Sequence, residues 1–114
     1  MRFDRTDRAT SIMTFFGGFA HLIQGRHEDA VTWLRWSRSL NPDYGSALLF
    51  YAAALALNGK NREAEEIFAE FRGRYPSFTL QTFRRQWLSR SSAAAYQRPI
   101  APLFDHIRLL GLPQ

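Results

Sequence analysis

Apolar residues recur every three or four positions along most of the chain, which is the spacing of helices that bury one face. Residues 47–57 are all apolar and are rich in alanine and leucine, which favour helix. Asn58-Gly59 then predicts a stop, because glycine readily adopts the left-handed conformation of a helix C-terminal cap. From Asn61, a candidate N-cap, to Tyr75-Pro76 a second helix is predicted. Its apolar stripe consists of Ala64, Ile67, Phe68 and Phe71.

The same helix–turn–helix pattern occurs once earlier in the chain. An offset of 34 residues places segment 11–44 on segment 45–78. We therefore divide the chain into an N-terminal arm (1–10), two repeats (11–44 and 45–78), and a degenerate third repeat with a C-terminal cap (79–114). Six pairs of residues are identical at this offset: Phe16 and Phe50, Ala20 and Ala54, Gly25 and Gly59, Ala30 and Ala64, Arg38 and Arg72, and Pro42 and Pro76.

The third unit keeps only part of the pattern. A first helix is predicted over 79–89, with Ser77 as a candidate cap. Pro99 and Pro102 are then expected to break the chain. A short amphipathic helix is predicted over 103–110, ended by Gly111 and Pro113.

Small residues at the helix crossing, a glycine turn and a terminal proline in a 34-residue unit resemble the tetratricopeptide repeat. The resemblance covers 68 of the 114 residues. It implies an all-α fold: a short right-handed α-solenoid of helix–turn–helix repeats with a C-terminal capping helix. The matching residues are Gly18, Gly25, Ala30, Leu34 and Pro42 in the first repeat, and Ala52, Leu55, Gly59, Ala64, Phe68 and Pro76 in the second.

A second resemblance is more specific. The segments 41–56 and 76–85, and the ending from Ile107 to Gln114, look like the C-terminal repeat region of certain bacterial multidomain regulators. In those proteins the repeats follow a class III adenylate cyclase-type catalytic domain or a winged-helix DNA-binding domain. The resemblance implies a regulatory or scaffolding helical module without an activity of its own.

In tetratricopeptide repeats the first helix of each unit lines a concave groove. Here those positions are apolar and aromatic, which favours an amphipathic helix or peptide as the ligand. An equally weighted alternative is that the stripe is internal core, covered by the N-terminal arm or by the last helix of the chain. The candidate groove residues are Phe15, Phe19, Leu49, Phe83 and Trp87, together with Ile12, Leu22, Ala53 and Ala56.

The charge adds another candidate surface. The net charge is +5, and arginine supplies 14 of the 15 basic residues. No acid lies between Glu70 and Asp105. This stretch predicts either a solvated face or a basic patch for an acidic or nucleic-acid partner, and nucleic acid is disfavoured because no nucleic-acid-binding motif accompanies the arginines. The basic patch comprises Arg72, Arg74, Arg84, Arg85, Arg90 and Arg98.

The sequence offers no constellation typical of an enzyme, a metal site or a cofactor site. His21 aligns with Leu55 and is interpreted as a packing residue. The longest nearly apolar run, 12–23, is shorter than the roughly 20 residues of a membrane span, and the first ten residues do not resemble a signal peptide. We therefore expect a cytoplasmic protein that does not bind membranes.

These observations predict a non-catalytic protein–protein interaction module that binds a partner through the groove or associates with itself. A homodimer would cover an open end of a short stack, with Trp36 as a candidate contact. Binding of an acidic partner through the basic patch is the alternative.

Overall fold

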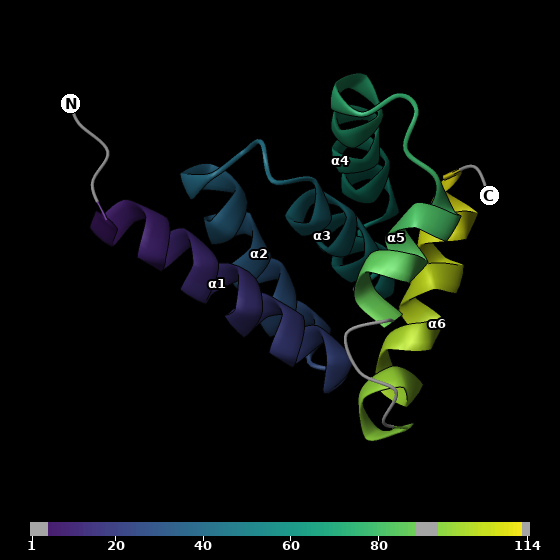
Figure 1. Ribbon diagram of the computed structural model, residues 1–114, viewed down its shortest axis with the longest axis horizontal. Coiled ribbons are helices and arrows are strands. Elements are labelled where there is room, and N and C mark those ends of the chain that lie inside the picture. The colour runs from purple at the N-terminus through teal and green to yellow at the C-terminus, as the bar shows by residue number, and fades with distance from the viewer. Residues whose placement is uncertain (1–4, 89–93, 113–114) are drawn as a thin grey trace.

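The computed structural model describes residues 5–88 and 94–112, and within them every regular element is an α-helix (Figure 1). The all-α prediction is therefore confirmed. The helices are α1 (Arg5–Ile23), α2 (His27–Leu40), α3 (Gly45–Leu57), α4 (Asn61–Arg74), α5 (Leu80–Leu88) and α6 (Ala94–Leu110). None of them combines the length and the apolarity that a bilayer span requires.

The turns between α1 and α2 and between α3 and α4 are copies of each other. Gly25 and Gly59 both have a φ of 79°, in the left-handed region that favours glycine. In the first turn the amide of Arg26 donates to the carbonyl of His21 at 2.9 Å, and in the second Lys60 donates to Leu55 at 2.8 Å. These bonds close the helix ends as a Schellman motif. Helices α2 and α4 also begin and end at equivalent residues, so the helix–turn–helix unit recurs at an offset of 34 residues.

Small residues set the distance between the helices of each pair. A Cβ added to Gly18 of α1 would lie 2.6 Å from Cγ of Leu34 in α2. Ala52 of α3 and Ala64 of α4 are fully buried. Because a larger side chain would push the axes apart, these positions explain why the sequence keeps glycine and alanine there.

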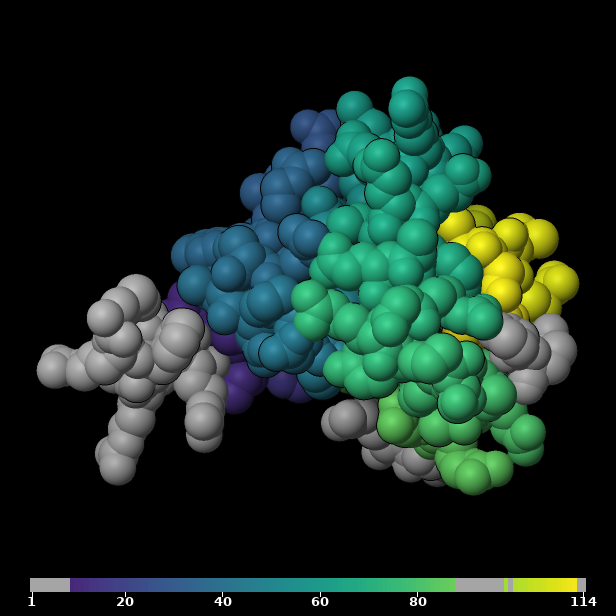
Figure 2. Space-filling model, turned by 90° about the horizontal axis from the view of Figure 1, so that it is seen from above, coloured from purple at the N-terminus to yellow at the C-terminus, as the bar shows by residue number. Residues whose placement is uncertain are grey.

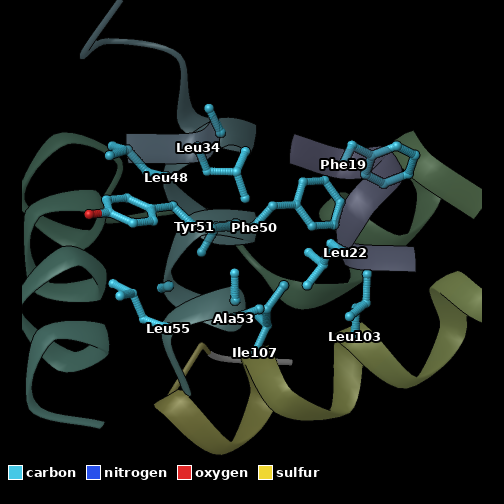
Figure 3. Packing of buried hydrophobic residues seen from close by; sticks show 14 of the residues in the cluster. Phe19, Leu22, Leu34, Leu48, Phe50, Tyr51, Ala53, Leu55, Leu103 and Ile107 are labelled. Carbon is cyan, nitrogen blue, oxygen red and sulfur yellow. The ribbon is translucent and has the colours of Figure 1, made fainter. Parts of the chain in front are cut away.

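The two units are joined by apolar packing and by polar contacts. Helix α3 packs against α2 and α1, and almost all of its length is buried (Figure 3). The guanidinium of Arg38 in α2 donates from Nε to Glu70 Oε2 of α4 at 3.2 Å and makes a second bond to Oε1. This paired carboxylate raises the pKa of the Arg38 guanidinium, which stays charged.

The ends of several elements differ from the predictions. Asn61 is the first residue of α4, and no side chain caps this helix. At α5 the hydroxyl of Thr79, not of Ser77, accepts a bond from the amide of Thr82 at 3.3 Å. Helix α1 begins at Arg5, so it extends into the segment predicted as an arm.

The largest difference is α6. Instead of a break at Pro99 and Pro102 and a short helix after them, one helix runs through both prolines. A proline inside a helix costs about 3 kcal/mol because it removes a backbone hydrogen bond and crowds the preceding turn. Burial of the apolar face of α6 against α3 and α5 offsets this cost. That face consists of Ile100, Leu103, Phe104 and Ile107, each no more than 4% exposed.

We predict that Ala64→Leu lowers the free energy of unfolding by about 1–3 kcal/mol, because the larger side chain overpacks the α3–α4 crossing. Ala69→Leu in the same helix is the matched control, since Ala69 is exposed and its replacement should change stability by less than about 0.5 kcal/mol. Urea unfolding followed by circular dichroism measures both. Equal stability of the two variants would contradict the close crossing.

Candidate functional site

Most of the predicted groove residues lie in the hydrophobic core; of the others, Ile12 is exposed and Ala56 is half-buried. Phe15 and Phe19 of α1, Leu49 of α3, and Phe83 and Trp87 of α5 are each at most 7% exposed. The prediction of an open groove lined by these side chains is wrong for this structure. The alternative weighed beside it describes them correctly: the stripe is internal core, and the last helix, α6, packs against it.

The side chain of Trp87 is buried where the open groove was predicted. Its ring centroid lies 5.6 Å from that of Phe15, 5.2 Å from Phe19 and 5.1 Å from Phe50. The indole Nε1 donates a hydrogen bond to Ser46 Oγ at 3.1 Å, so burial does not leave this polar atom unpaired. Three helices, α1, α3 and α5, therefore meet at one aromatic cluster.

Helix α6 closes the cluster from the other side. Leu103 and Ile107 of α6 approach Leu22 of α1 and Ala53 of α3, as Figure 3 shows. The rings of Phe83 and Phe104 meet edge to face with centroids 5.4 Å apart. A partner could enter this region only after α5 and α6 had moved away.

The predicted basic patch is partly engaged within the molecule. Arg72 donates to the carbonyl of Gly111 at 3.4 Å, and Arg74 pairs with Asp43 and lies 3.9 Å from Glu70. The guanidinium of Arg84 lies 5.7 Å from the ring centre of Phe104, in cation–π geometry.

The structure describes two of the three other arginines of the patch. Arg85 and Arg98 are exposed, and Arg90 lies outside the described residues. Arg72, Arg74 and Arg84 thus have a structural role beside any role in binding.

The residues with potential chemistry do not converge. Among the described residues no three His, Cys, Asp or Glu side chains are placed to hold a metal ion. His21 is half-buried with its ring 6.0 Å from that of Trp33, as expected for a packing residue, and its Nδ1 has no hydrogen-bond partner within the described part of the chain.

A small hollow lies where α3 begins, beside the connection from α4 to α5. Its walls are mostly aromatic, and the hydroxyl of Tyr75 donates to the backbone carbonyl of Asp43. It contains no ionisable group that would select a ligand. The lining residues are Tyr44, Gly45, Ser46, Phe71, Tyr75, Phe78 and Gln86.

The most distinctive exposed surface lies on the first unit. Four large apolar side chains are 48–68% exposed there: Ile12, Met13 and Phe16 of α1 and Trp36 of α2. We call this surface the N-terminal end face. Figure 2 shows that the first unit (blue) and α6 (yellow) form opposite ends of the molecule. Exposed apolar surface of this kind on one helix is typical of a binding site.

The ring of Trp33 in α2 packs against α1 beside the N-terminal end face. A Cβ on Gly17 would lie only 2.8 Å from the ring of Trp33, so the absence of a side chain lets the indole lie flat on α1. The ring of Trp36 follows, with its centroid 5.8 Å from that of Trp33. The two indoles extend the apolar surface of α1 onto α2.

In the second unit, the residues equivalent to Met13 and Phe16 are buried. Met13 and Phe16 align with Ala47 and Phe50 of α3, which are at most 1% exposed. Phe50 is covered partly by the first unit, since its ring lies 5.1 Å from that of Phe19, and partly by Phe83 and Trp87 of α5 at the same distance. The N-terminal end face is thus the surface on which a preceding unit would pack.

The polar contacts between units lead to the same conclusion. Trp36 aligns with Glu70, which binds Arg38 of the first unit. Both α1 and α2 therefore present toward solvent the side that α3 and α4 use to contact the unit before them. Reasoning from the sequence identified Trp36 as a candidate contact but missed Met13 and Phe16, which a comparison of equivalent positions in the two repeats could have found.

Comparison with known proteins adds no assignment: no model of a protein family, no curated protein and no solved structure matches the chain.

We predict that Trp87→Ala destabilises the protein by about 3–5 kcal/mol, because truncation leaves a cavity among three aromatic rings. Leu109→Ala is the control, since Leu109 is 72% exposed and its loss should cost less than about 0.5 kcal/mol. Denaturant unfolding measures both. If Trp87→Ala left stability unchanged, Trp87 would line an open groove and the closed cluster described above would be wrong.

Proposed function

We propose that the protein is a non-catalytic helical repeat module that binds a protein partner through the N-terminal end face. The observation that carries this proposal is the exposure of four large apolar side chains, three of which (Met13, Phe16 and Trp36) have repeat equivalents that are buried or ion-paired with the first unit. Covering them would remove apolar surface from water, which is the main favourable term in protein association.

The geometry of the repeats supports a tetratricopeptide-like architecture as part of the proposal. The recurrence of φ and of the capping hydrogen bonds at Gly25 and Gly59 is the best support for it. In this view α1 to α4 form the start of a short right-handed solenoid, and α5 with α6 forms its C-terminal cap. Terminal units of such stacks shield the last apolar face, as α6 does here.

The resemblance to the repeat regions of bacterial regulators suggests the setting: a regulatory or scaffolding role in the cytoplasm. The partner would be a protein or peptide helix. Helices are favoured because the equivalent face of α3 is covered by helices α1 and α2.

The end face is favoured over the groove because no helix of the protein has to leave its position. Binding at Phe15 or Phe83 would expose the aromatic cluster and release α5 and α6 from α3. The basic patch is disfavoured as the main site, since Arg72, Arg74 and Arg84 all contact other parts of the chain.

A site-specific crosslinking experiment tests the proposal. With a photo-reactive phenylalanine in place of Phe16, irradiation of a cell extract should give an adduct between this protein and a partner, while the same residue in place of Leu109 should give none. Both positions are exposed, so reactivity alone predicts equal labelling. Because the contact is apolar, the yield should change little between roughly 50 and 200 mM salt.

Equal adducts from both positions, or no adduct from position 16, would contradict the proposal. A yield that fell steeply with salt and was lost in an Arg85→Glu, Arg98→Glu variant would favour the basic patch instead.

A further inference from the structure

The two ends of the molecule differ in chemistry. Outward-facing residues of α6 include the ionisable Asp105 and Arg108 beside the exposed Leu109. The N-terminal end face consists of four apolar side chains, and residues 9–25 of α1 and its turn contain no Asp, Glu, Lys or Arg. Packing one copy's end face on another copy's α6 would bury Asp105 and Arg108 without partners, which disfavours head-to-tail stacking.

We infer that the occupant of the N-terminal end face is the same face of a second copy, so that the protein forms a symmetric dimer. This inference rests on the proposed function and names its partner. An uncharged face offers a charged protein nothing to pair with, whereas a second uncharged face complements it fully. Each chain carries a net charge of +5, and the absence of charged residues from 9–25 keeps like charges away from the centre of the contact between the two copies of α1.

The shape of α1 suits a two-fold contact. With 19 residues it is about 28 Å long, and its outward stripe lies near the middle of the helix. At 100° per residue, Phe16 lies between Ile12 on one side and Met13 on the other. Two copies of α1 crossing near Phe16 would bring this side chain to the two-fold axis, with Trp36 of each copy at the edge.

The available apolar area is sufficient. The four side chains are 48–68% exposed, and at about 200 Å² for a large side chain they offer about 400 Å² in each copy. Two copies would bury about 800 Å² of apolar surface, which corresponds to about 1,200 Å² in an interface that is about 65% apolar. This exceeds the roughly 1,000 Å² expected of a specific contact.

Sedimentation over a range of concentrations tests the dimer. We expect the wild-type chain to reach twice its 13.2 kDa mass and no more. Phe16→Glu should weaken dimerisation at least about a hundredfold, because the symmetry brings the two new carboxylates together in an apolar contact. Leu109→Glu, a charge placed on an exposed apolar residue of α6, should leave the dimer unchanged. Circular dichroism verifies that both variants are folded.

A second measurement uses the absence of cysteine from the chain. Ala20 lies one turn after Phe16 and is half-buried in the single chain. Under mild oxidation Ala20→Cys should form an inter-chain disulfide, whereas Leu109→Cys should remain largely monomeric.

The outcomes separate this inference from the function on which it rests. A monomeric wild type with a crosslink from position 16 to another protein overturns the dimer and keeps the protein-binding function. A monomeric wild type without any crosslink overturns both. A dimer that survives Phe16→Glu, or masses that grow beyond the dimer, overturns the symmetric contact at this face.

Discussion

The indole of Trp87 lies among the rings of Phe15, Phe19 and Phe50, and the arrangement of the other helices depends on this contact. It connects α5 to α3 and, across more than half of the sequence, to α1. Without it α6 would lose the surface formed by α3 and α5 together, and the apolar face that compensates for Pro99 and Pro102 would have no partner. The hydrogen bond to Ser46 fixes the orientation of the indole in the cluster.

Closure of the groove changes where the molecule can bind. The positions predicted to line a groove are buried in a core that includes residues of α5 and α6, and α6 packs against α3. The first unit keeps the face that the second unit buries. The proposal of binding at the N-terminal end therefore rests on the same aromatic contact that closes the interior.

The sequence could predict what depends on neighbouring residues. The turns at Gly25 and Gly59 follow from local chemistry, and so do the helices beside them. The position of α6 could not be predicted in this way, because its continuation through Pro99 depends on contacts with helices distant in the sequence. For the same reason the pattern identified an apolar stripe containing Trp87 but left open whether solvent or another helix covers it.

Hydrogen exchange of the Trp87 indole, followed by NMR in the Phe16→Glu variant, tests the closed cluster most directly. This variant removes any protection that comes from self-association. We predict that the Trp87 indole proton exchanges orders of magnitude more slowly than that of free tryptophan, because its release requires α5 to separate from α1 and α3. Exchange at the rate of free tryptophan would show an open groove and contradict the account.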